Sequence, residues 1–138
     1  MSFREKRALI TLIAVGLVTV AYAAAAFKAP PASVIGAVPG LVGSMILLIS
    51  IMMISHIVLV IVAGAKEARR PSDERDRLID LSSRRNAGWI GQAGLWIIFM
   101  LALGPAPHLT LAYGALGAFV LAELVLYASQ LFYYRRGV

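Results

Sequence analysis

LVGSMILLISIMMISHIVLVIVAGA, residues 41–65, contains no Asp, Glu, Lys or Arg. A helix rises about 1.5 Å per residue and about twenty apolar residues cross a bilayer, so this stretch is long enough to span a membrane with some tilt. Three further stretches are almost as apolar: 8–27, 87–103 and 109–132. The sequence therefore predicts an all-α integral membrane four-helix bundle, with residues 1–138 forming a single transmembrane domain.

The overall composition agrees with a membrane environment. Hydrophobic residues make up 60% of the 138-residue chain, whereas soluble domains average about 45–50%. A soluble chain of this size has too little interior to hide so much apolar surface. The chain has no cysteine, which excludes disulfides, thiolate metal sites and a cysteine nucleophile.

The basic residues are distributed asymmetrically along the chain, and every one except Lys28 falls on one side of the predicted spans. They are Arg4, Lys6 and Arg7 before the first span, Lys66, Arg69, Arg70, Arg75, Arg77, Arg84 and Arg85 between the second and third, and Arg135 and Arg136 after the fourth. Basic loops stay in the cytoplasm. Both termini and the 66–86 connection should therefore be cytoplasmic, in an inner (plasma) membrane. Since this topology accounts for the net charge of +6, we expect lipid and not nucleic acid to be the charged partner.

Prolines and glycines mark the predicted ends of the spans. Pro30-Pro31 follows the first stretch, Pro39-Gly40 precedes the second, and Gly104–Pro107 separates the third from the fourth. Proline removes a helix donor and disfavours helix before it. The basic start and apolar 8–27 stretch also resemble a signal peptide, but this stretch is longer than a typical signal core and is interpreted as a retained span.

The 66–86 connection is the only long polar stretch. Ser72 can cap a helix whose first turn contains Asp73 and Glu74. No helix breaker lies between Asp73 and Leu103, so one helix, cytoplasmic at first and then membrane-spanning, is expected. Charges at helical spacing predict a ladder of ion pairs on one face, formed by Asp73, Arg77, Asp80 and Arg84.

Two interpretations of this charged ladder remain open. It either rigidifies a solvated linker or forms a docking surface for a cytoplasmic protein. Leu78 and Leu81 lie off the ladder and would rest on the membrane surface or on a partner. The predicted docking residues are Asp73, Glu74, Arg75, Asp76, Arg77, Asp80 and Arg84.

Asp73-Glu74-Arg75-Asp76, with Ile79 three residues on, lies between the second and third predicted spans. In this motif and in its four-span layout the chain resembles a family of small prokaryotic membrane proteins of unknown function with an Asp-Glu-Arg motif at that position. The resemblance covers the layout loosely and the motif closely. It implies a four-span membrane protein and implies no activity, cofactor or catalytic residue.

Two ionisable residues lie inside the apolar stretches, His56 in the second and Glu123 in the fourth. Such residues are costly in a bilayer and are therefore candidate functional groups. Both are predicted near mid-membrane, where they would hydrogen-bond if their helices were neighbours. Mostly polar residues recur at helical spacing along the fourth stretch and just beyond it: Tyr113, Val120, Glu123, Tyr127, Gln130 and Tyr134. Some of these residues, with His56 of the second stretch and Gln92 of the third, predict a buried polar seam. Its members are His56, Glu123, Tyr127, Gln130 and Gln92.

The predicted seam has three alternative roles. It fixes the helix register by hydrogen bonds, or it relays protons between Glu123 and His56. The third role is metal or haem binding. Met52 and His56, four residues apart on a helix, would bind copper, or His56 from each of two copies of the chain would bind haem. Two protein ligands make a weak site, so we predict no cofactor and no metal.

Small residues in two of the apolar stretches indicate close helix contacts. They are Gly88, Gly91 and Gly94 in the third stretch and Ala14, Ala21 and Ala25 in the first. These surfaces would pack either within the bundle or between two protomers. A homodimer is expected.

No enzyme motif is present in the sequence, because it has neither a phosphate loop nor His-Glu-x-x-His. A non-enzymatic structural, sensing or partner-docking role is therefore predicted, with the 66–86 connection as the docking segment. The alternative is a proton-coupled small transporter that uses Glu123 and His56. It resembles small four-helix multidrug exporters, although these carry their glutamate in the first helix. A third alternative is an accessory subunit of a larger membrane complex.

Overall fold

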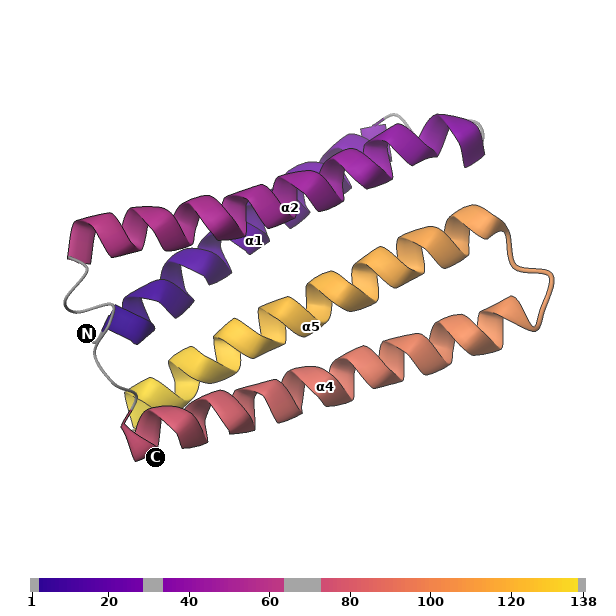
Figure 1. Cartoon of the computed structure of the whole chain (residues 1–138). Coiled ribbons are helices and arrows are strands. Elements are labelled where there is room, and N and C mark those ends of the chain that lie inside the picture. The colour runs from indigo at the N-terminus through magenta and orange to yellow at the C-terminus, as the bar shows by residue number, and fades with distance from the viewer. Residues whose placement is uncertain (1–2, 29–33, 64–72, 137–138) are drawn as a thin grey trace.

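Four helices make up the part of the chain that the structure describes. The computed structural model describes residues 3–28, 34–63 and 73–136, and contains α1 (Phe3–Lys28), α2 (Val34–Ala63), α4 (Glu74–Ala102) and α5 (His108–Arg136) (Figure 1). The predicted all-α class is confirmed, and each predicted span coincides largely with one helix. The predicted cap Ser72, the prolines Pro30 and Pro31, the basic residues Lys66, Arg69 and Arg70, and the side chain of Ala25 lie outside the described residues.

The start of the second helix was predicted incorrectly. Helix α2 begins at Val34, and Pro39 lies inside it, although Pro39-Gly40 was expected to precede the helix. Proline removes one backbone hydrogen bond from a helix. Near the start of a helix the effect is smaller, because only a short piece of helix precedes the proline.

The single long helix predicted from Asp73 onward is confirmed. Helix α4 runs from Glu74 to Ala102, so residues 74–86 of the predicted connection are helical. Its N-cap is Asp73, whose Oδ1 accepts a hydrogen bond from the Glu74 N–H at 2.7 Å. At the other end, Gly104–Pro107 forms the predicted tight turn into α5.

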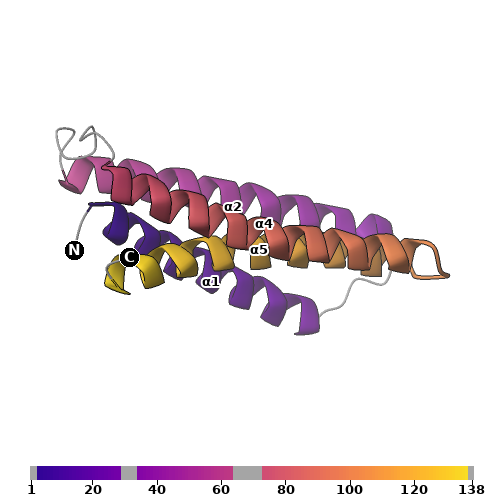
Figure 2. The same cartoon turned by 90° about the horizontal axis from the view of Figure 1, so that it is seen from below.

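The helices form two antiparallel pairs, α1 with α2 and α4 with α5, and both chain ends lie at the same end of the bundle (Figures 1 and 2). Helix α5 packs extensively against α4 and also against α1, whereas α2 contacts α1 and barely reaches α5. The order of neighbours is therefore α2, α1, α5, α4. This order decides which polar side chains can meet.

The apolar core lies between α1, α2 and α5. Its buried residues are Val15, Val18, Leu48, Leu116 and Val120, and the partly buried Ile51, Met52 and Leu124 pack against them. Helix α4 is held to α5 by a separate contact. A Cβ added at Gly94 would overlap the Cβ of Ala118, and one at Gly91 would lie 3.8 Å from the Cβ of Ala122. The predicted small-residue surface is therefore confirmed at these two glycines, while Gly88 has no such neighbour.

The outside of the bundle is apolar. Many large apolar side chains are exposed over most of their surface: the exposed fraction is 73% for Ile61, 69% for Trp89 and 63% for Trp96. Two helical segments, Val38–Ile61 and His108–Arg136, are long and apolar enough to cross a membrane. Water-soluble monomers rarely carry such extensive apolar surface, which is weak support for a membrane protein.

Candidate functional site

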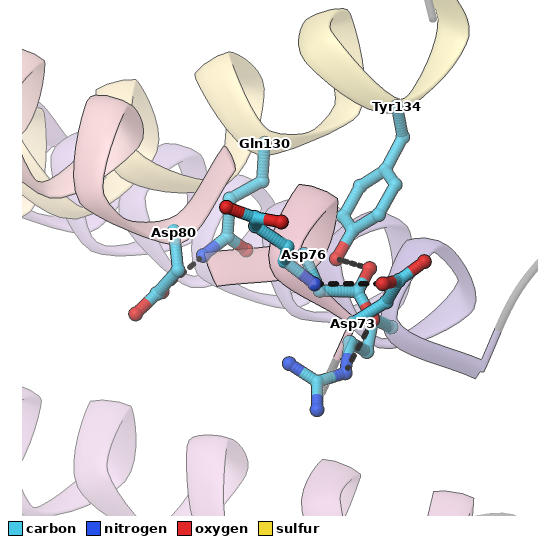
Figure 3. A network of polar contacts seen from close by, with 7 residues as sticks. Asp73, Asp76, Asp80, Gln130 and Tyr134 are labelled. Atoms are coloured by element: carbon cyan, nitrogen blue, oxygen red, sulfur yellow. Dashed lines mark hydrogen bonds and ion pairs between the residues drawn. The ribbon is translucent and has the colours of Figure 1, made fainter. Parts of the chain in front are cut away.

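Three helices meet in a polar cluster at the end of the bundle that holds both chain ends. The polar cluster consists of Arg4 from α1, Asp76 and Asp80 from α4, and Gln130 and Tyr134 from α5 (Figure 3). The Tyr134 hydroxyl donates to Asp76 Oδ1 at 3.1 Å, and Arg4 Nε lies 3.4 Å from Asp76 Oδ2. One carboxylate of α4 therefore binds both neighbouring helices, α5 and α1.

Asp80 makes the second contact of the polar cluster. Gln130 Nε2 donates to Asp80 Oδ1 at 3.2 Å, and Arg84 Nε donates to Asp80 Oδ2 at 2.9 Å. Gln130 is only 6% exposed, so its amide relies on this bond. The hydrogen bond and the charge of Asp80 raise the pKa of the Arg84 guanidinium above its ordinary value.

Two further hydrogen bonds extend the polar contact between α4 and α5. Asn86 Nδ2 donates to Ser129 Oγ at 3.3 Å and to the Tyr133 hydroxyl at 3.1 Å. Arg75 Nη2 donates to the backbone carbonyl of Tyr134 at 3.4 Å. That carbonyl lies in the last turn of α5, where carbonyl groups have no hydrogen-bond donor within the helix. The partial negative charge of this helix end favours a cation such as the Arg75 guanidinium.

The predicted ion-pair ladder forms only in part. Asp80 and Arg84 pair as expected, but Asp73 is used as the helix cap and Asp76 is paired with α1. Most of the predicted docking residues are exposed: Asp73, Glu74, Arg75, Arg77 and Arg84. Asp76 and Asp80 are half-buried and bind other helices, and the assignment of all seven residues to a docking surface stays a prediction. The charged segment is part of the bundle and not a free linker.

The fold sorts the residues of this segment by side. The carboxylates of Asp76 and Asp80 face the bundle, whereas Arg77 and Arg85 are exposed. Leu78 and Leu81 are also exposed, at 60% and 63%. Two of the four acidic residues of the described segment thus turn toward the bundle, while its arginines and leucines are exposed together with Asp73 and Glu74.

The predicted seam is brought together only in part. Gln130 is buried, and Glu123 and Tyr127 are half-buried on α5. His56 and Gln92 are exposed, and among the described residues no hydrogen bond joins His56 to Glu123. The reason is that α2 meets α5 over only a short stretch and that His56 lies on an exposed side of α2. The polar partners of α5 come instead from α4 and from Arg4.

Two buried polar atoms have no hydrogen-bond partner in the described parts of the chain, Glu123 Oε2 and Ser83 Oγ. Ser83 is completely buried on α4, and Glu123 is on α5. The charge of Glu123 also acts on Arg84, next to Ser83. A buried polar atom without a hydrogen-bond partner lowers the stability of the folded state. Glu123 Oε2 and Ser83 Oγ are therefore destabilising features of the fold.

No group of three His, Asp or Glu side chains that could hold a metal occurs among the described residues. Met52 packs against the core while His56 is exposed, so the proposed pair does not converge on one buried point.

Sequence reasoning missed three residues of the polar contacts, namely Arg4, Asn86 and Ser129, and the buried Ser83. Part of the signal was present. Asp76, Asp80, Ser83 and Asn86 recur every three or four residues, which puts them on one face of a helix. That face lies opposite Leu78 and Leu81 and indicates which side of α4 meets the bundle.

Comparisons with protein-family models, with curated proteins and with solved structures found no match for this chain.

Proposed function

We propose that this chain is an inner-membrane protein of four spans with both termini cytoplasmic, and that its role is non-enzymatic docking of a cytoplasmic partner. The apolar exterior and the confinement of basic residues to one side support this topology. Helix α1 contains 26 residues, long enough to cross a hydrocarbon core of about 30 Å. The lipid bilayer would cover the exposed apolar residues.

The docking surface is the outward face of the first half of α4, which we define as Arg77, Leu78, Leu81, Arg84 and Arg85. The observation that carries the proposal is the exposure of Leu78 and Leu81 within a charged segment. Charges before and after the leucines keep this segment out of the hydrocarbon core. Exposed leucines flanked by arginines suit a protein segment with apolar and acidic side chains, since apolar contact gives affinity and opposite charge gives orientation.

The test is photo-crosslinking in native membranes, with a photoreactive amino acid at Leu81 and, as matched control, at Trp96 farther along α4. We expect a specific cytoplasmic protein to crosslink at position 81 only. Replacing Leu78 and Leu81 by Gln, or Arg77 and Arg85 by Glu, should abolish capture. Equal capture by these variants, or crosslinks at position 81 to lipid alone, would contradict docking.

We also propose that the chain is related to the small four-span membrane proteins with an Asp-Glu-Arg motif between the second and third spans. Each motif residue with a described contact here holds α4 in place. Asp73 caps the helix, Arg75 binds the last turn of α5, and Asp76 binds Arg4 and Tyr134. This supports a role for the motif in fixing α4 so that its outward face is presented to a partner.

A proton pathway through Glu123 is the second candidate, and the buried, unpartnered Oε2 atom favours it. The pathway would lead toward the polar cluster through Tyr127 and Gln130, with Ser83 of α4 beside it, and His56 would take no part. Proton flux into liposomes tests this. Glu123→Gln should abolish flux while His56→Gln should leave it unchanged. Absence of flux in the unmodified protein would eliminate this candidate.

A further inference from the structure

Helix α2 is an edge of the bundle, because it packs on α1 and barely touches α5. A stripe of residues along its outer side is uncovered. We define the α2 outer stripe as Val42, Ile46, Ile49, Met53 and His56. The four apolar members are half or more exposed, and His56 is exposed with them.

The spacing of the α2 outer stripe is alternately four and three residues. This spacing keeps side chains on a single face over several turns and is the pattern by which two helices pack along their length. The four apolar side chains of this face are 50–60% exposed, whereas Leu48, on the inner side of α2, is buried in the core.

His56 makes lipid an unsuitable cover for this stripe. It lies seven residues before Ala63, the last residue of α2, and α2 contains no charged residue. In the proposed membrane topology, on which this inference rests, its imidazole lies within the hydrocarbon region, where lipid tails offer no hydrogen bond. Ionisable residues at such depths almost always face protein or water.

We propose that the α2 outer stripe is the interface of a homodimer, in which a second copy of this chain packs its own α2 against it and the two His56 side chains meet. A two-fold axis along the membrane normal sets two copies of α2 parallel, so identical residues lie at identical depth. A neutral imidazole carries one donor and one acceptor nitrogen. One His56 can therefore donate to the other, and the stripe is complementary to itself.

Glu123 does not provide an alternative partner within the chain. The α2 outer stripe faces away from the bundle, and the contact between α2 and α5 is slight. The dimer also does not depend on docking at α4, because the two surfaces are on different helices.

Disulfide mapping tests the proposal directly, since the chain has no cysteine of its own. Single-cysteine variants Ile49→Cys and Met53→Cys would be reconstituted in liposomes and oxidised. The control is Ile97→Cys on α4, which is also exposed and lies at about the same distance from the nearest basic residue. We expect dimer bands from the α2 variants and none from the control. Equal bands from all three, or none from any, would overturn the proposal.

A second measurement tests the role of His56. Dissociation of the dimer on dilution in lipid or detergent would be followed for His56→Leu, for His56→Asn and for Met53→Leu as control. Losing an interhelical hydrogen bond should weaken the dimer about fivefold in His56→Leu. His56→Asn, which keeps a donor and an acceptor, and Met53→Leu should stay close to the unmodified protein. Unchanged or tighter association of His56→Leu would refute the His56 contact. If Met53→Cys formed a disulfide with a different protein in native membranes and no homodimer, the proposal that a second copy of this chain covers the stripe would be refuted.

Discussion

Gly94 of α4 and Ala118 of α5 lie in such close contact that any side chain at position 94 would collide with Ala118. This contact allows the two helix backbones to approach where the apolar half of α4 has few buried side chains. Close approach of small residues is the main source of helix association in lipid, because burial there brings no hydrophobic gain. The attachment of α4 to α5 in this half therefore depends on the absence of a Cβ.

Gly94→Ala should destabilise the bundle by about 1–3 kcal/mol, the usual cost of overpacking. Gly91→Ala is the matched control, because its added Cβ would make only an ordinary contact with Ala122. That variant should be neutral or up to about 1 kcal/mol more stable, since alanine favours helix over glycine. Unfolding in detergent micelles, followed by far-UV circular dichroism, measures both. Equal stability of the two variants would contradict the close contact.

Asp76→Asn should loosen the junction of α1, α4 and α5, because the Asp76 carboxylate both pairs with Arg4 and accepts from Tyr134. The ion pair is partly exposed, so we expect a coupling free energy of about 0.2–1 kcal/mol in a double-mutant cycle of Arg4→Gln and Asp76→Asn. The Asp76–Tyr134 bond, measured with Tyr134→Phe, should contribute about 1.5–3 kcal/mol, as for hydrogen bonds to charged groups. A coupling of zero in both cycles would show that Asp76 does not join the helices.

Gln130→Glu should destabilise the protein in a pH-dependent way. It would set a second carboxylate against Asp80, to which Gln130 now donates. Burial and the neighbouring carboxylate would raise the pKa of the new carboxyl at position 130 above its value in the unfolded chain, so its ionised form destabilises the fold more than its protonated form. The free energy of unfolding of this variant, relative to the unmodified protein, should therefore improve as the pH falls from 7 to 5. Gln130→Leu is the control, since it loses the hydrogen bond without adding charge, and its deficit should be independent of pH.

The number of helices followed from the sequence because apolar length and the prolines between runs are local signals. The position of α4 relative to α5 was partly indicated by Gly91 and Gly94, although a glycine pattern does not identify the neighbouring helix. The same difficulty explains the failure to pair His56 with Glu123. Their predicted depths were compatible, but depth determines neither which helices are neighbours nor which side faces inward; α2 and α5 touch only slightly, and His56 is exposed.

The polar cluster was missed for a related reason. Asp80 was assigned to an ion-pair ladder because it lies at helical spacing from Arg77 and Arg84, and Asp76 was assigned to a docking surface. Their partners Arg4, Gln130 and Tyr134 are far away in the chain. Helical periodicity identifies which residues share a face but cannot reveal which of the two charged faces of α4 is covered.

Ser83→Ala should stabilise the bundle. Ser83 is completely buried, and its Oγ has no hydrogen-bond partner among the described residues. Its removal eliminates the cost of an unsatisfied hydroxyl, about 1–3 kcal/mol, and alanine also favours helix more than serine does. Ser129→Ala is the matched control in the same interface, because Ser129 Oγ accepts a hydrogen bond from Asn86. It should be destabilised by about 0.5–1.5 kcal/mol. The midpoint of thermal unfolding in micelles should thus rise for one serine variant and fall for the other. A fall in both would mean that the Ser83 hydroxyl makes a stabilising contact.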